Sequence, residues 1–215
     1  MIKLNITKKM TGKLEGISSL NTDPFSNPFC MKMSAQPKSV CSQCYSQAML
    51  KAYRKSCQKP WAENGENLSK RLLTPQELPV IKKSIFRFSA HGEIINKTMY
   101  LNYLAIARNN PDTSFTVWTK RKDIIAKIGK AGVNNIILIY SSPILNDLNP
   151  VVPTNFDKVF TVYTPDVAGP NDVKINCGKK KCIECMSCYS QNDTTHINEI
   201  VKSKQHIWNH MQEVK

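Results

Sequence analysis

The sequence predicts an α/β protein, built either as a partial β/α barrel or as a small, mostly parallel sheet with helices and with Cys-rich loops at both chain ends. Four short runs are rich in aromatic and β-branched residues, as buried strands are. They span residues 84–90, 114–120, 135–142 and 158–164. Helix-forming segments separate the first three, which favours parallel pairing through right-handed crossovers. Four or five strands are too few for a closed eight-stranded barrel.

Helical sequence lies on both sides of the first strand-like runs. The predicted helices cover residues 42–59, 64–73, 97–109 and 123–130. A closing helix is predicted from Asn192 onward, where His196, Ile200, His206, Trp208 and His210 occur. Residues 1–40, rich in Asn, Ser, Lys and Pro, are predicted to be mostly loop with at most one short strand.

The chain is predicted to be a single domain. Its 215 residues can bury one hydrophobic core without disulfide support, and no internal repeat or long low-complexity linker divides it. Within the domain we distinguish a basic, cysteine-containing segment (1–60), a β/α core (84–165) and a Cys-rich loop (174–190).

The charge balance favours a polyanionic partner. The formal net charge is +14, and the first sixty residues hold ten Lys or Arg against only Glu15 and Asp23. A basic surface attracts nucleic acid or a nucleotide through counterion release, although scattered lysines also serve solubility alone.

The sequence also predicts the compartment. No stretch approaches the ~18–20 consecutive apolar residues of a membrane span, and the N-terminus lacks the apolar core of a signal peptide. We therefore expect a cytoplasmic protein with no membrane partner. In a reducing cytosol, grouped cysteines usually serve metal or redox chemistry.

The eight cysteines form two groups at opposite ends of the chain. The C-terminal group is Cys177, Cys182, Cys185 and Cys188, and its last three members have the C-x2-C-x2-C spacing that bacterial ferredoxins use. Zinc knuckles also use C-x2-C, but usually with a longer insert between pairs. We therefore expect an iron–sulfur cluster of the 4Fe–4S type, with zinc as the alternative, and one or two such centres in the chain.

The N-terminal group is less regular. Cys30, Cys41 and Cys44 are the predicted ligands, whereas Cys57 lies in helical sequence and is doubtful. Cys41 and Cys44 lie where a loop enters the predicted helix 42–59, whose free N–H groups favour an anionic ligand. If Cys57 is not a ligand, three thiolates would leave one iron of a cluster open.

Polar side chains at three predicted strand ends suggest a pocket. The carboxyl edge of a parallel sheet is where ligands usually bind, and a glycine there permits close approach to the backbone. Ordinary turn chemistry explains any one of these residues better than a binding role does, and only their coincidence favours a pocket. The candidate cofactor-binding residues are His91, Gly92, Glu93, Thr119 and Lys120, with residues 141–143 following the next strand.

Other metal and cofactor patterns are weak or missing. His206 and His210 have the i, i+4 spacing of a helical metal pair, but a surface helix end explains them as well. The chain has no GxGxxG, GxxxxGK[ST], HExxH or GxSxG pattern, so the sequence gives no support for dinucleotide binding, a P-loop, a zincin or a serine hydrolase.

Four features, in the same order, resemble the bacteriophage gene-product-eighty-eight family, which is itself similar to radical S-adenosylmethionine proteins. They are Cys44-Tyr45, the run from Phe86 to Glu93, the run from Val117 to Lys120, and the C-x2-C-x2-C-aromatic run from Cys182 to Tyr189. The resemblance covers the chain from about Phe29 to Tyr189. The usual C-x3-C-x2-C loop is absent, and C-x10-C-x2-C stands in its place.

The resemblance implies a phage-encoded protein of the host cytoplasm, a partial β/α barrel and cysteine-bound iron–sulfur. It also implies that residues 91–93 hold the amino group of S-adenosylmethionine. A radical-type enzyme acting on a nucleic acid or nucleotide, supplied by an electron donor, is the function this suggests. The alternative is a metal-stabilised (iron–sulfur or zinc) nucleic-acid- or protein-binding module without catalysis.

Overall fold

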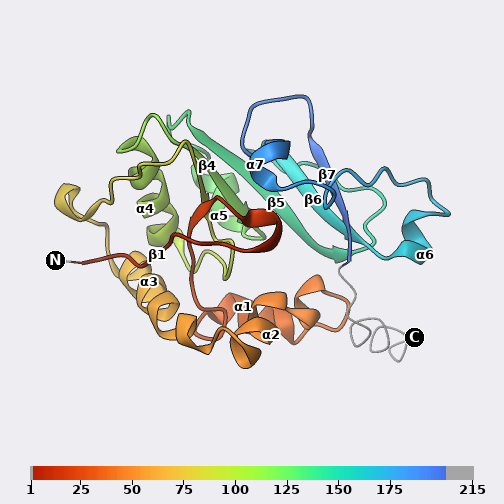
Figure 1. Cartoon of the computed structure of the whole chain (residues 1–215), viewed down its shortest axis with the longest axis horizontal. Helices are drawn as coiled ribbons and strands as arrows, with labels where there is room; N and C mark the ends of the chain where they lie inside the picture. Colours follow the sequence, from red (N-terminus) through yellow and green to blue (C-terminus); the bar gives the residue numbers. More distant parts are fainter. Residues whose placement is uncertain (1, 202–215) are drawn as a thin grey trace.

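The computed structural model describes residues 2–201. Its centre is a seven-stranded sheet whose strands follow one another in chain order, from β1 to β7 (Figure 1). The β1–β2 pair is antiparallel and all later pairs are parallel. This consecutive order is how a β/α barrel is wound, but the sheet is not closed into one. The predicted α/β class with a mostly parallel sheet is confirmed.

The four predicted strands correspond to β3, β4, β5 and β6, and the structure adds β1, β2 and β7. The strands are β1 Ile6–Thr7, β2 Ser18–Leu20, β3 Ile85–Phe88, β4 Ser114–Thr119, β5 Ile136–Leu145, β6 Lys158–Tyr163 and β7 His196–Ile200.

Strand β2 corrects the prediction that residues 1–40 are mostly loop with one short strand. It lies between β1 and β3, and all three of its residues are buried. Its polar side chains are accommodated because Ser19 Oγ donates to Met10 Sδ at 3.2 Å and accepts from Asn21 Nδ2 at 2.8 Å. A strand of two serines and one leucine lacks the β-branched residues by which strands are usually detected.

Strand β7 corrects the prediction of a closing helix from Asn192. Residues 196–200 instead pair in parallel with β6. Ile197 packs into the hydrophobic cluster on the sheet face, because alternate residues of a strand point to opposite faces. The predicted histidine pair His206 and His210, together with Trp208, lies outside the described residues.

The predicted helices 42–59, 64–73, 97–109 and 123–130 are present with shifted ends. The short helices Pro28–Ser34, Pro165–Ala168 and Cys182–Cys185 are not predicted from the sequence, and the first of them lies in the segment expected to be mostly loop. The predicted helix 42–59 is broken by a 3-10 turn at Lys55–Cys57, and the next helix begins at Gln58 and ends at Lys70 instead of covering 64–73. The helices are α1 Pro28–Ser34, α2 Tyr45–Ala52, α3 Gln58–Lys70, α4 Lys97–Arg108, α5 Lys122–Ile128, α6 Pro165–Ala168 and α7 Cys182–Cys185.

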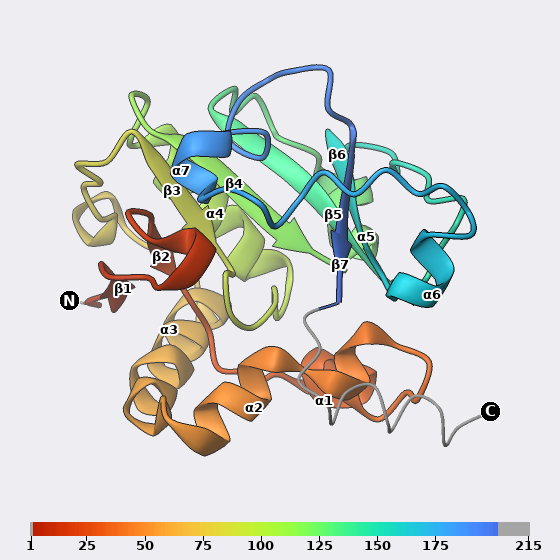
Figure 2. The same cartoon turned by 45° about the vertical axis from the view of Figure 1, so that its right-hand side comes forward.

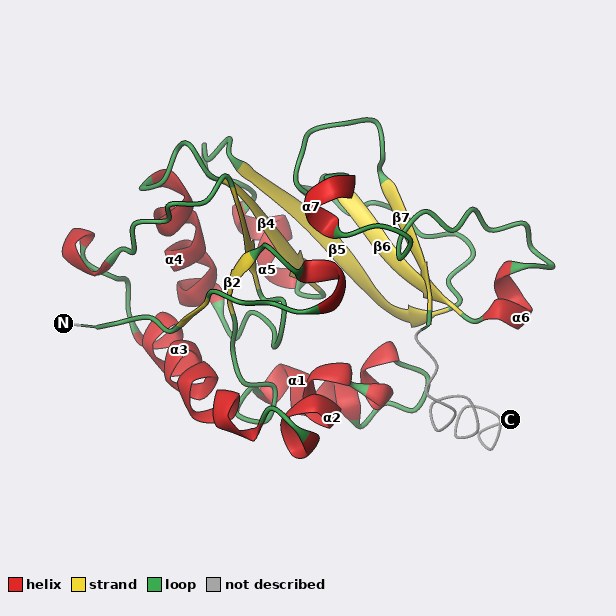
Figure 3. Ribbon diagram, viewed as in Figure 1, coloured by secondary structure: helices red, strands yellow, loops and turns green. Residues whose placement is uncertain are grey.

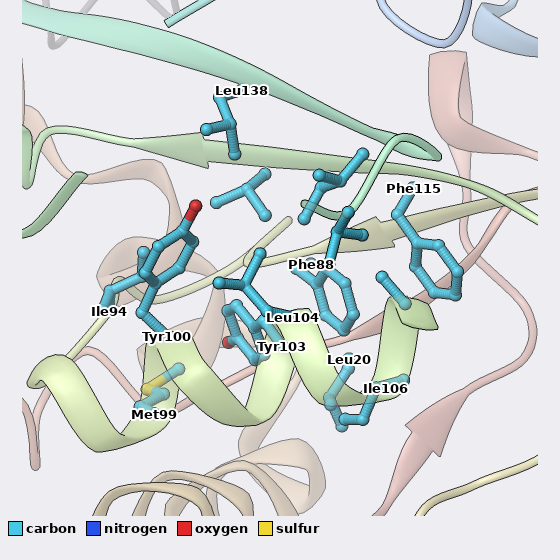
Figure 4. Packing of buried hydrophobic residues seen from close by; sticks show 14 of the residues in the cluster. Leu20, Phe88, Ile94, Met99, Tyr100, Tyr103, Leu104, Ile106, Phe115 and Leu138 are labelled. Atoms are coloured by element: carbon cyan, nitrogen blue, oxygen red, sulfur yellow. The ribbon is translucent and has the colours of Figure 1, made fainter. Parts of the chain in front are cut away.

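Helices α3, α4 and α5 contribute to the core on one sheet face, where the larger hydrophobic cluster lies. Figure 4 shows α4 directing Tyr100, Tyr103 and Leu104 toward the strands. Tyr103 stacks on Phe88 of β3 with ring centroids 4.2 Å apart. This packing fixes where β3 and β4 end, and those ends carry the candidate pocket.

The opposite face is covered mainly by irregular chain. Ile17 and the loop residues Cys188 and Tyr189 pack there against Ile137 and Ile139 of β5. Figure 2 shows α7 in front of this face, while α1 and α2 lie below the sheet, beside its edge. Figure 3 shows that loops with short helical turns form this cover. Among residues 2–201, no helix is long and apolar enough to cross a membrane.

Candidate metal centres

The three predicted N-terminal ligands come together. Burial raises the pKa of the Cys30 thiol most, and the neighbouring charges of Glu93, Cys44 and Cys41 raise it further. The three cysteines come from different elements: Cys30 from α1, Cys41 from the 3-10 turn Val40–Gln43, and Cys44 from the residue before α2. We call them the three-thiol group.

Asn27 positions Cys30 relative to the sheet. Its side-chain oxygen accepts hydrogen bonds from the backbone N–H groups of Phe29 and Cys30, so it caps α1. Its Nδ2 donates to the backbone oxygen of Glu93 at 2.9 Å. One buried amide therefore connects the first turn of the cysteine-bearing helix to the loop that follows β3.

The start of α2 faces Cys44, as the sequence predicts. Burial raises the pKa of the Cys44 thiol, while hydrogen bonds from the backbone N–H groups of Gln47 and Ser46 lower it in part. Free N–H groups at a helix start favour negative charge on a neighbouring atom. The geometry thus favours a thiolate at Cys44 once another group, such as a metal, offsets its burial.

Cys57 lies apart from the three-thiol group. It is half-buried and packs against the hydrophobic cluster of Met49, Leu50 and Trp61. It also lines a surface pocket with Lys3 and Pro60. Whether Cys57 is a metal ligand stays a prediction. Its position makes Cys57→Ala a suitable control for variants of the other cysteines.

Glu93 joins the ends of β3 and β4. One carboxylate oxygen accepts from Thr119 Oγ1 at 2.6 Å and from the N–H of Ile94 at 2.8 Å. The other accepts from the N–H of Lys120 at 2.8 Å. Burial raises the pKa of Glu93, and these hydrogen bonds and the Lys120 charge oppose that rise. A carboxylate has about four acceptor positions, so one is left for a further donor.

Lys120 extends the group to the third strand. Its Nζ donates to Ser141 Oγ of β5 at 2.9 Å. Its charge also lowers the pKa values of Cys30 and Cys44. The ends of β3 and β4 therefore converge beside the three-thiol group, whereas the third predicted strand end is corrected: Ser141 lies inside β5, which continues through an irregularity to Leu145. Their cofactor-binding roles stay predictions.

Gly92 is required by a contact within the chain. Its φ is +79°, and a Cβ added there would lie 2.3 Å from the backbone oxygen of Thr22. The N–H of Thr22 donates to the backbone oxygen of His91 at 3.1 Å. The close approach expected at this glycine is thus made by the segment after β2. Ser89, at φ 51°, turns the chain into this loop.

His91 is part of an aromatic stack. Its ring stacks on Trp61 with centroids 4.7 Å apart and on Tyr45 with centroids 5.7 Å apart. Its Nδ1 shares a hydrogen bond of 2.9 Å with Ser46 Oγ. Burial, with smaller contributions from the Arg87 and Arg54 charges, lowers the pKa of His91 to about 3. His91 is therefore neutral at physiological pH and ties α2 to the end of β3.

The four C-terminal cysteines form a second group on the sheet face. Burial raises the pKa of Cys188 to about 12, and the charges of Cys177, Cys182 and Cys185 raise it as well. Cys185 is exposed, and a hydrogen bond from Ser187 lowers its pKa. We call this set the four-thiol group.

Two cations that sequence reasoning missed face the four-thiol group. Lys13 Nζ lies 3.5 Å from Cys177 Sγ and 2.6 Å from the Glu199 carboxylate. Arg87 of β3 is only 8% exposed and lowers the pKa values of Cys182 and Cys188. Both lie far from these cysteines in sequence, and isolated cations among thirty Lys and Arg carry no distinguishing pattern.

Arg87 is held over an indole ring. Its guanidinium carbon lies 4.2 Å from the ring centroid of Trp118, a cation–π contact. Its Nε has no hydrogen-bond partner among the described residues. A buried donor without a partner is costly unless an acceptor is present in the working protein.

The fold and these sites define the chain as an open α/β protein with two separate groups of free thiols. Across residues 2–201, no three His, Cys, Asp or Glu side chains are arranged to hold a metal ion. The chain belongs to the Gene product 88 family, whose sequence model matches residues 3–211. This match supports the phage gene-product family that the motifs resemble. No curated protein and no solved structure matches the chain.

Proposed function

We propose that this protein is an iron–sulfur protein in which the four-thiol group holds a 4Fe–4S cluster. The carrying observation is that Cys177, Cys182 and Cys188 pack into one cluster on the sheet face, where Lys13 Nζ lies 3.5 Å from Cys177 Sγ, while none of the four cysteines forms a disulfide. A cluster would be held by four thiolates, which is the donor set that iron–sulfur centres use. When bound, it would supply reversible one-electron transfer.

The surrounding residues fit such a centre. Lys13 and Arg87 place positive charge where thiolates would carry negative charge. Ile17 and the buried Tyr189 exclude water from the sheet side. Cys185 and Ile183 are exposed, which leaves a surface where an electron donor could approach.

We further propose that the three-thiol group holds a second centre with one open coordination position, and that Glu93 orients the amine of S-adenosylmethionine there. Support comes from the resemblance to radical enzymes, from the carboxylate acceptor position left free on Glu93, and from its electrostatic effect on Cys30. Lys120 would offset charge on the thiolates. A nucleic acid or nucleotide of the host cytoplasm would be the substrate, in keeping with the net charge of +14.

Anaerobic iron and sulfide analysis per chain tests the metal proposal. One cluster gives about four irons and two give about eight. Cys188→Ala should remove the four-thiol centre, Cys44→Ala the three-thiol centre, and Cys57→Ala, outside both groups, should change neither. Zinc without sulfide, or equal loss in all three variants, would contradict the proposal.

The radical step is tested separately. The reduced, reconstituted protein should bind S-adenosylmethionine and form 5′-deoxyadenosine, and Glu93→Gln should weaken binding with iron content unchanged. An iron-loaded protein that does neither is the non-catalytic binding module instead.

Two contacts favour that second candidate. Ile183 of α7 packs on Gly16, at 3.2 Å from where a Cβ would stand, and Lys181 pairs with Glu15 at 3.0 Å. The four-thiol loop thus fastens the N-terminal segment to the sheet, as a structural metal clip would. If Cys188→Ala unfolds the protein, that role is favoured.

A further inference from the structure

One long stretch of the chain carries only positive charge. Residues 24–62 contain no Asp or Glu. The cations in this stretch are Lys32, Lys38, Lys51, Arg54, Lys55 and Lys59. Lys51 lies on α2, Lys55 on the 3-10 turn after it and Lys59 at the start of α3, while Arg54 directly precedes the turn. Positive charge is therefore concentrated along consecutive elements at the edge of the molecule (Figure 1).

Two tyrosines are exposed among these cations. Tyr45 is 62% exposed and Tyr53 is 66% exposed, although large aromatic side chains are usually mostly buried. They lie near each other, because the charge of Tyr53 contributes, after burial, to raising the pKa of Tyr45. We call residues 45–59 the tyrosine surface.

Tyr45 is held in place although it is exposed. Its ring stacks on His91, which is buried and stacks in turn on Trp61. The Ser46–His91 hydrogen bond fixes the first turn of α2 against the same ring. A ring that is already immobilised loses little conformational entropy when a further ring stacks on it.

We infer that the tyrosine surface binds single-stranded nucleic acid. Tyr45 and Tyr53 would stack on bases, and Arg54, Lys55 and Lys59 would contact phosphates. This combination of exposed aromatic rings and unopposed cations is how proteins hold single strands without reading sequence. A duplex offers phosphates but no free base faces, so the tyrosines distinguish the two.

This inference rests on the proposed function, which already names a nucleic acid or nucleotide as the substrate, and it adds the surface that would bind it. Tyr45 directly follows Cys44, so a strand bound here would lie beside the three-thiol group. The surface would therefore bring a nucleotide of the strand to the proposed reactive centre.

Fluorescence anisotropy with a labelled oligothymidylate of about twenty nucleotides tests the inference, on protein purified anaerobically. Tyr45→Ala and Tyr53→Ala should each weaken binding about tenfold, since base–aromatic stacking contributes about 1–3 kcal/mol per base. Tyr45→Phe should bind like the parent protein, because it keeps the ring. A duplex of the same sequence should bind less tightly and should not respond to the tyrosine variants.

Charge placement supplies the matched control. The pair Lys55→Glu and Lys59→Glu should weaken binding more than the pair Lys82→Glu and Lys83→Glu, which makes the same charge change on an exposed loop before β3. Equal effects of the two pairs would mean that net charge alone attracts the nucleic acid, and the inference would be wrong. Unchanged binding by Tyr53→Ala would also overturn it, because Tyr53 adjoins Tyr45 but is not itself stacked on His91.

Measuring the iron content distinguishes failure of the nucleic-acid inference from failure of the iron–sulfur proposal. If the protein lacks iron but the tyrosine variants still lose single-strand binding, the iron–sulfur proposal fails and the tyrosine surface stands. If iron and sulfide are present and the variants bind normally, only the inference fails.

Discussion

A buried guanidinium beside thiols is stabilised further when those thiols carry negative charge, and Arg87, which already rests on the Trp118 ring, is in this position. The charge of Arg87 lowers the pKa values of Cys182 and Cys188 against the larger effect of burial. Its unpaired Nε also needs an acceptor. Both features are expected if a thiolate-bound centre is the partner that Arg87 faces in the working protein.

If the four-thiol group holds the proposed cluster, we predict that Arg87→Gln shifts its midpoint potential on the order of 50 mV more negative, since 59 mV corresponds to a tenfold change for one electron. The reason is that removal of a nearby positive charge disfavours the extra electron. Redox titration followed by absorbance measures it. Lys83→Gln, an exposed cation elsewhere, is the control, and an identical shift in both would refute a local role.

His91 predicts a pH dependence of stability. Its pKa is lowered from 6.5 to about 3 in the folded protein, mainly by burial. Between these values the unfolded chain binds the proton and the folded chain does not, so stability is complete above about pH 6.5 and falls as the pH is lowered. Between these two pKa values the free energy of unfolding falls by at most about 1.4 kcal/mol for each pH unit.

Urea unfolding at about pH 7, 6 and 5 tests this, with the free energy of unfolding as the readout. His91→Gln should lower stability at neutral pH but give a flatter pH profile than the parent protein. His196→Gln, on an exposed strand end, should keep the parent slope. A parent profile that does not fall below pH 6.5 would disprove the assignment.

At the scale of elements, the cap of α1 links folding to the three-thiol group. Asn27→Ala removes the cap and the hydrogen bond to Glu93, and a lost cap costs about 0.5–2 kcal/mol. We expect lower stability together with reduced iron retention at the three-thiol group, measured by chemical unfolding and by iron analysis.

Asn96→Ala is the matched control for this element. Asn96 caps α4 through the N–H of Met99 and also bonds to Ser69, remote from the thiols. It should lower stability by a similar amount and leave iron content unchanged. Similar iron loss in both variants would mean that overall stability, and not the position of Cys30, controls retention.

The elements also show what sequence can and cannot predict. Strands β3 to β6 are predicted because their aromatic and β-branched residues are buried on both faces. Strand β2 escapes prediction because serine fits there only through hydrogen bonds to Met10 and Asn21, which are tertiary contacts. Strand β7 escapes because its alternation of His, Ile, Asn, Glu and Ile is equally compatible with a short helix turn.

Much the same division holds for the candidate sites. The convergence of Glu93, Thr119 and Lys120 follows from parallel topology, since strand ends meet at one edge. The grouping of the cysteines follows from their spacing. Lys13, Arg87 and the tyrosine surface could not be predicted, because they depend on which loop covers which face.

At the scale of the whole molecule, metal removal should loosen one loop first. Apolar contacts, the Lys181–Glu15 ion pair and the hydrogen bond from Ser114 Oγ to the Tyr189 backbone oxygen hold the four-thiol loop on the sheet face. If the loop binds a metal centre as proposed, removal of that centre takes away its strongest restraint. Limited trypsin digestion should cleave after the exposed lysines 179–181 several-fold faster in chelator-treated protein. Cleavage after Lys82 and Lys83 should not change. Equal rates in loaded and stripped protein at residues 179–181 would show that the loop is held without metal.

The long connection between β2 and β3 has a consequence for the order of assembly. Strands β3 to β5 are joined by short crossovers, whereas β2 reaches β3 only across residues 21–84. Closing a longer loop costs more entropy, so local pairings tend to form earlier. All three cysteines of the three-thiol group lie within that connection. During synthesis the chain is therefore expected to complete its central sheet before these thiols reach the sheet edge, so any metal that the three-thiol group binds would enter late in maturation.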